Sequence, residues 1–291
     1  MFPLLIRILT FITHNGVEAG FLISNAALFL ACFLLYHLVK EDHGEDIATT
    51  TVFVMLFFPT AIFFSSIYSE APFLAFSLGA FYYARKGNWL AASALGACAA
   101  LTRNVGIVLF LAFLYLQYKE NGFRFTVRKT LPLFLIPASL GLFMLVLWKY
   151  TGDPLAFAHS LNTEYWGYRH FQYPGAGQFL NLSLFFNHSE FYSLFESGMA
   201  FLFLYLVVRS FKYIEDRSLL IFLVLGFLIP FSSVVDNLPL GMPRYILILF
   251  PGYITLARLL HKNNLVMVYS IISVIAFSIT CSLFVAGHWI S

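Results

Sequence analysis

LVMVYSIISVIAFSITCSLFVA, residues 265–286, is a continuous apolar stretch without a single charged side chain. A helix needs about 20 such residues to cross the hydrocarbon core of a bilayer, so this stretch predicts a transmembrane helix. Nine further apolar segments precede it, several of them shorter than a full span: 20–38, 48–66, 70–84, 88–102, 105–117, 131–149, 192–210, 218–235 and 244–259. We therefore expect an all-α polytopic membrane protein with about ten transmembrane or partly spanning helices.

The composition of the chain supports this class. Of its 291 residues, 60% are hydrophobic and only 11% are charged, and the mean hydropathy is +0.82. Soluble domains usually contain about 45–50% apolar and about 25% charged residues. We predict a single integral membrane domain over residues 1–291. The net charge of +3 gives no indication of nucleic-acid binding.

A short polar interruption, Thr102-Arg103-Asn104, separates the segments 88–102 and 105–117. A single long helix would place Arg103 in the middle of the membrane, which is costly, so two short helices are favoured. With ten segments, twelve of the 17 Lys and Arg residues fall on one side of the membrane and five on the other. Because basic residues gather on the cytoplasmic side, the amino terminus and a longer loop at about 150–191 are predicted to be external.

The external loop is rich in aromatic residues and turn formers. It contains Gly152-Asp153-Pro154, Tyr165-Trp166-Gly167-Tyr168 and Tyr173-Pro174-Gly175-Ala176-Gly177. Aromatic rings combined with Gly and Pro are typical of a segment at the membrane interface. We expect this loop to lie on the bilayer surface.

Glu70 lies at a predicted helix start on the external side. In Ser69-Glu70-Ala71-Pro72, the proline suits the first turn of a helix. The helix dipole would favour an ionised carboxylate at that end. Glu70 is therefore either an N-terminal cap or an acid that orients or deprotonates a sugar hydroxyl.

Arg103 and Arg244 are the most informative cations on the same side. Arg103 lies at the carboxyl end of segment 88–102, where the dipole favours a cation, and Asn104 is expected to cap the next helix. Arg244 lies at a helix start, where the dipole opposes a cation, so an anion is expected nearby. The two candidates are Asp236 and a bound lipid phosphate, whose oxygens a guanidinium group binds through paired donors.

Neither a metal motif nor a nucleotide motif is present in the sequence. The eight histidines and three cysteines lack the spacing of a metal site, and the cysteines are expected to be buried thiols: Cys32, Cys98 and Cys281. Without a Walker-type or GxGxxG loop, a nucleotide substrate is not indicated. We therefore predict no cofactor.

Four motifs, in this order along the chain, resemble the PIG-V family of mannosyltransferases. They are FFPTAIFFSSIYSE at 57–70, AALTRNVG at 99–106, GDPLAF at 152–157, and PRY at 243–245 followed by FP at 250–251. The resemblance implies a GT-C-type glycosyltransferase in the membrane. Such an enzyme moves a sugar, here mannose, from a polyprenyl or dolichyl phosphate to a glycolipid or protein acceptor at the external or lumenal face.

The resemblance also implies roles for individual residues. An external carboxylate would accept the proton of the acceptor hydroxyl, and Glu70 is the candidate within these motifs. Arg103 and Arg244 would stabilise charge on the departing lipid phosphate. The residues expected to bind substrate or to shape the sugar and lipid site are Arg103, Arg244, Tyr68, Asn104, Tyr245, Asp153 and Trp166.

The sequence departs from the family at its beginning. Residues 1–7 resemble the segment that follows the family's first helix and its acidic loop, where the catalytic aspartate is expected. Either the true start lies upstream, or the chain lacks this base. Two alternatives therefore stay open: a lipid-phosphate transporter or flippase that uses the same arginines, and a non-catalytic membrane subunit. The short loops favour the plasma membrane of a prokaryote over the endoplasmic reticulum.

Overall fold

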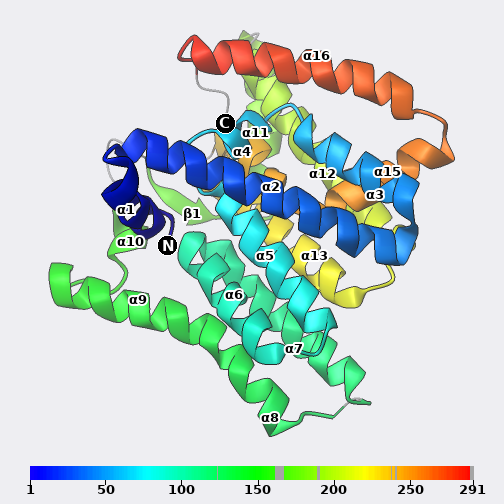
Figure 1. Cartoon of the computed structure of the whole chain (residues 1–291). Coiled ribbons are helices and arrows are strands. Elements are labelled where there is room, and N and C mark those ends of the chain that lie inside the picture. The colour runs from blue at the N-terminus through cyan, green and yellow to red at the C-terminus, as the bar shows by residue number, and fades with distance from the viewer. Residues whose placement is uncertain (123, 161–166, 189–190, 237, 240, 289–291) are drawn as a thin grey trace.

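The computed structural model describes residues 1–291 except 123, 161–166, 189–190, 237, 240 and 289–291. The described chain is built of helices together with one small three-stranded sheet (Figure 1). Four of its helices are long and apolar enough to cross a membrane: Gly16–His43, Val127–Thr151, Tyr192–Tyr213 and Val266–Val285. The all-α class expected from the sequence is therefore confirmed.

The helices follow one another with short connections. Those of ten or more residues are α1 (Phe2–Thr13), α2 (Gly16–His43), α3 (Glu45–Leu56), α5 (Glu70–Arg85), α6 (Trp89–Thr102), α7 (Val108–Glu120), α9 (Leu135–Thr151), α11 (Ala176–His188), α12 (Phe191–Tyr213), α13 (Arg217–Phe231), α15 (Phe250–Lys262) and α16 (Val266–Val285). Single turns lie between them: α4 (Ile62–Ser65), η1 (Asn104–Ile107), α8 (Val127–Thr130), η2 (Leu131–Phe134), α10 (Ala156–His159), α14 (Met242–Tyr245) and η3 (Ile246–Ile248).

The predicted break near Arg103 is confirmed. Helix α6 ends at Thr102, and Arg103 has an extended backbone with φ −146° and ψ 134° before the chain enters η1. The turn depends on Gly106, because a Cβ there would lie 2.5 Å from the backbone nitrogen of Ala100. Only a residue without a side chain allows η1 to fold back so closely onto α6.

Three predicted segments are less regular than expected. In 48–66, α3 stops at Leu56 just before Pro59, whose ring and missing N–H cannot continue a helix. The segment 218–235 leaves its helix at Phe231 and ends in the strand β2 (Ser233–Val235). The segment 244–259 is divided among α14, η3 and α15.

The stretch 150–191, predicted as a longer loop, contains regular structure. It holds α10, the strand β1 (Arg169–Phe171) and the helix α11. β1 pairs antiparallel with β2, with Phe171 opposite Ser233, and β2 pairs with β3 (Leu238–Pro239). The chain beyond α9 is therefore fastened to the end of α13 by backbone hydrogen bonds.

Helix α5 occupies the middle of the bundle, between α2 and α6 (Figure 1). Its Phe81 is fully buried and contacts three other rings edge to face, with centroids 5.0 Å away for Phe113, 5.7 Å for Phe222 and 5.6 Å for Phe250. These rings come from α7, α13 and α15. Each such aromatic pair contributes about 0.5–1.5 kcal/mol of stability in addition to the burial of apolar surface. Helix α5 is therefore held firmly in the bundle and fixes the positions of the side chains at its two ends.

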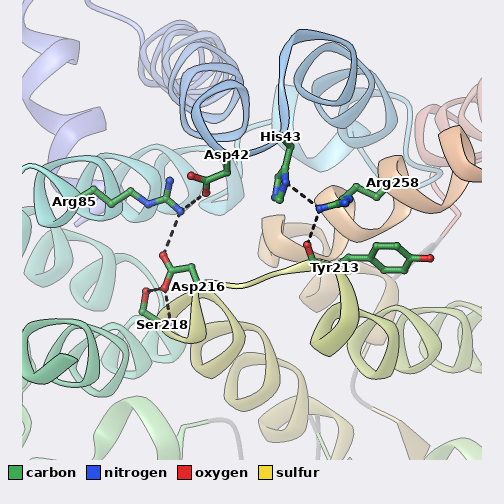
Figure 2. A network of polar contacts seen from close by, with 7 residues as sticks. All are labelled: Asp42, His43, Arg85, Tyr213, Asp216, Ser218 and Arg258. Atoms are coloured by element: carbon green, nitrogen blue, oxygen red, sulfur yellow. Dashed lines mark hydrogen bonds and ion pairs between the residues drawn. The ribbon is translucent and has the colours of Figure 1, made fainter. Parts of the chain in front are cut away.

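The carboxyl end of α5 carries Arg85 into a polar network (Figure 2). Its guanidinium lies 2.7 Å from Asp42 and 3.2 Å from Asp216, which joins α2, α5 and the connection between α12 and α13. In the same network, Arg258 donates to the carbonyl oxygen of Tyr213 at 3.1 Å and lies 3.2 Å from Nδ1 of His43. The opposite end of α5, about 22 Å away at 1.5 Å per residue, carries Glu70.

Candidate active site

Glu70 is the first residue of α5, as the position of Pro72 predicts. Its side chain does not cap the helix; Ser69 is the cap residue, and it makes no side-chain cap hydrogen bond. The Glu70 side chain is fully buried, with an exposed fraction of 0%. The helix dipole stabilises a carboxylate at this end, but burial of a charge also requires a cationic partner.

Arg103 supplies one such partner. Because the backbone is extended at the end of α6, its side chain turns back toward α5, and Nη1 donates to Oε1 of Glu70 at 2.5 Å. The side chain is 12% exposed. Its guanidinium also lies 5.3 Å from the ring centroid of Tyr245, a cation–π contact. Arg103 therefore contacts one acid and one aromatic ring from two distant parts of the chain.

Arg244 supplies the second partner. Gly241, in the left-handed conformation at φ 60°, starts the single turn α14, and this turn aims Nε of Arg244 at the same Oε1 atom of Glu70. The guanidinium lies 4.3 Å from the ring centroid of Tyr68 and 5.2 Å from that of Phe63. The Arg244 side chain is 25% exposed, so it remains reachable from outside the protein.

Asp236, one of the two anions considered for Arg244, forms no ion pair with it in the described part of the chain. Asp236 accepts the backbone N–H of Tyr168 at 3.0 Å, and the two residues are joined by a second, backbone hydrogen bond. This pairing continues the β1–β2 ladder by one residue, with Asp236 in a left-handed conformation at φ 49°. Asp236 thus extends the sheet by hydrogen bonding, and Glu70 is the acid that forms an ion pair with Arg244.

Two cations therefore share one buried carboxylate oxygen, and the group of three carries a formal charge of +1. The second oxygen of Glu70, Oε2, is buried and has no hydrogen-bond partner among the described residues. Breaking a buried ion pair from one side costs several kcal/mol, so the three side chains depend on one another. The guanidinium of Arg103 lies over the ring of Tyr245, and that of Arg244 lies over the ring of Tyr68.

Two other predicted site residues, Asn104 and Asp153, form no ion pair with this group in the described part of the chain. Asn104 is exposed and lies inside η1 as its first residue, so the expectation that it caps the next helix is wrong; α7 begins only at Val108. Asp153 accepts the Leu155 N–H at 2.9 Å and pairs with Nδ1 of His159 at 2.7 Å. Both contacts lower the pKa of the Asp153 carboxyl, the backbone one most. Trp166 lies outside the described residues.

Phe63 and Thr60 are contact residues that sequence reasoning did not single out, although both lie in the motif 57–70. Phe63 lies against Arg244, and Thr60 donates its hydroxyl to the carbonyl oxygen of Pro243 at 2.8 Å. Their position within a motif was the available signal. In the described part of the chain, His, Cys, Asp and Glu side chains form no group of three that could hold a metal ion.

Comparison with known proteins places this chain in a family. Comparison with curated proteins and with solved structures gives no match. The family model described as Mannosyltransferase (PIG-V) matches residues 5–177, more than half of the chain. Glu70 and Arg103 lie within the match, and Arg244 lies beyond it but is joined to both by the shared oxygen. The chain belongs to the PIG-V mannosyltransferase family.

Proposed function

We propose that this glycosyltransferase moves a hexose, in the first instance mannose, from a polyprenyl or dolichyl phosphate to an acceptor at the external or lumenal face of the membrane. The observation that carries the proposal is the pair of arginines on Glu70 Oε1. Guanidinium groups offer forked donors that match phosphate oxygens, and two of them can hold one phosphate. A GT-C-type fold in a prokaryotic plasma membrane is part of the proposal.

The proposed reaction is a single displacement. The acceptor hydroxyl oxygen forms a bond to the anomeric carbon while the bond from that carbon to the lipid-phosphate oxygen breaks, so the lipid phosphate leaves with the electron pair. Arg103 and Arg244 stabilise the charge on this leaving group. The acceptor proton passes to a carboxylate base.

We propose an orienting role for Glu70 in this reaction. Its Oε1 atom already accepts from both arginines, so protonating Glu70 would release the two groups that bind the phosphate. A carboxylate that holds the cations in place supports the leaving group without taking the acceptor proton. In this proposal the acceptor proton passes to a carboxylate other than Glu70.

The test uses purified protein in liposomes with a radiolabelled mannosyl-phosphoryl-polyprenol donor and membrane lipid extract as acceptor. Arg103→Ala should lower kcat/KM by about 10²–10³-fold, the effect of removing one charge-stabilising donor, and Arg103→Lys should recover only part of it. The matched control is Arg7→Ala, which removes an exposed arginine from the same predicted side.

Two results would contradict the proposal. Full turnover by Arg103→Ala would exclude the phosphate-binding role of the arginine. Movement of the donor across the liposome membrane without a glycosylated product would instead support the transporter alternative, because the same cations can hold a lipid phosphate without any bond being made or broken.

A further inference from the structure

The turn that presents Arg244 does not hold itself in place. α14 is only four residues long, and its cap residue is Gly241, which has no side chain to accept the first N–H groups of the turn. A helix start leaves backbone N–H groups without partners, and a buried one needs an acceptor from elsewhere. Met242 is fully buried, so its N–H requires such an acceptor.

Glu196 is that acceptor, and it comes from α12, far away in the sequence. Its Oε1 accepts the N–H of Met242 at 3.1 Å. The side chain of Glu196 is 4% exposed. Its other oxygen accepts Nδ2 of Asn181 at 3.3 Å, which ties it to α11.

The other side of the turn is held as well. Thr60, which is fully buried, donates its hydroxyl to the carbonyl oxygen of Pro243 at 2.8 Å. Met242 and Pro243 directly precede Arg244. The Gly241–Met242 peptide unit is therefore bonded to α12, and the Pro243–Arg244 peptide unit is bonded to the 57–70 motif. The direction of the Arg244 side chain follows from these two hydrogen bonds.

We infer that Glu196 is a positioning residue for Arg244, which it aligns with Glu70 and Arg103. A buried carboxylate is costly unless it is paired, and in the described part of the chain no Lys or Arg forms an ion pair with Glu196. Two hydrogen-bond donors account for its presence: the Met242 N–H in the Arg244 turn and the side-chain amide of Asn181. The inference rests on the proposed function only through the phosphate-binding role of Arg244.

A double-mutant cycle tests this role. Glu196→Ala should lower kcat/KM about tenfold in the wild-type background, the effect of one lost charge-assisted hydrogen bond, and should have no further effect in an Arg244→Ala background. Glu196→Gln retains an acceptor oxygen and should recover most of the activity. The control is Ser197→Ala, because Ser197 is fully buried in the same polar cluster but bonds to Gln178 and Asn181 instead of the turn.

Hydrogen exchange gives a second measurement that does not depend on catalysis. The Met242 and Arg244 amides should exchange at least tenfold faster in Glu196→Ala than in Glu196→Gln or Ser197→Ala. Equal losses of kcat/KM in the wild-type and Arg244→Ala backgrounds, or unchanged exchange at Met242, would overturn the inference. If the wild-type protein transfers no sugar, the proposed function fails, and the exchange measurement alone decides whether Glu196 holds the turn.

Discussion

Replacing Glu70 by glutamine tests the central electrostatic feature of the site. The substitution keeps the size of the side chain and one acceptor oxygen but removes the negative charge that Arg103 and Arg244 share. Both cations are largely buried, so little solvent is available to replace the lost carboxylate. The change therefore isolates the charge from the shape of Glu70.

The size of the effect follows from the geometry. Both guanidinium groups contact the same oxygen, so their nearest nitrogens lie within about 5 Å of each other. At an effective dielectric constant of about 20, two unit charges at that separation repel by roughly 3 kcal/mol. We expect Glu70→Gln to lower the free energy of unfolding by about 3 kcal/mol, near the range of roughly 3–5 kcal/mol for removing one partner of a buried ion pair.

The assay is unfolding in mixed detergent micelles followed by circular dichroism. Glu45→Gln is the matched control, because Glu45 forms an ion pair with Lys40 that is 66% exposed on the glutamate side, and such pairs contribute less than about 1 kcal/mol. Inorganic phosphate should stabilise Glu70→Gln more than the wild-type protein, because it binds the uncompensated cations of the folded state. Equal stability of the Glu70→Gln and Glu45→Gln variants would refute the reasoning.

Three further predictions concern the scaffold of the site. Gly106→Ala should lower the free energy of unfolding by roughly 1–3 kcal/mol and displace Arg103, because the new Cβ would lie 2.5 Å from the backbone of Ala100. The control is Gly141→Ala, which has open space around it and should be neutral or stabilising by up to about 1 kcal/mol. Thermal unfolding compares the two variants. Arg85→Ala removes the ion-pair partner of Asp42 and Asp216 and should lower the free energy of unfolding by about 1–3 kcal/mol. The control is Lys86→Ala, which removes an exposed side chain and should change the free energy of unfolding by less than about 0.5 kcal/mol. Equal losses in the two variants would show that the ion pairs of Arg85 do not stabilise the protein. Phe81→Ala should cost about 3–5 kcal/mol in the same assay, since it opens a cavity among three rings.

Much of the helical framework could be predicted because it depends on local pattern. Continuous apolar runs mark α2 and α16, and the cost of a charge inside a membrane correctly divided α6 from α7 at Arg103. Helix α11 escaped prediction because its apolar residues are interrupted by the buried polar residues Gln178 and Asn181. Asn181 donates to Glu196 and Ser197 of α12. The three strands escaped it because segments of two or three residues have no periodicity to recognise.

The partners of the site residues were less predictable than the residues themselves. Glu70, Arg103 and Arg244 are conspicuous in sequence because charges are rare in apolar surroundings. Glu70 lies 33 positions from Arg103 and 174 positions from Arg244, so their pairing depends on how distant helices pack. Local dipole arguments offered Asp236 or a lipid phosphate for Arg244 and did not point to Glu70. Glu196 gave no signal, since it belongs to none of the four motifs and its partners, a backbone N–H and an amide side chain, are distant in sequence or uncharged.

The shared oxygen of Glu70 has a consequence for biosynthesis. Arg103 emerges from the ribosome soon after Glu70, but Arg244 follows roughly 140 residues later, which at about 5–20 residues per second takes on the order of 7–30 s. During this interval the nascent carboxylate has one cation instead of two. The site is therefore completed only when the segment that carries Arg244 has entered the membrane. A ribosome that stalls before residue 244 leaves a product that contains Glu70 and Arg103 but lacks Arg244, the second member of the phosphate-binding pair.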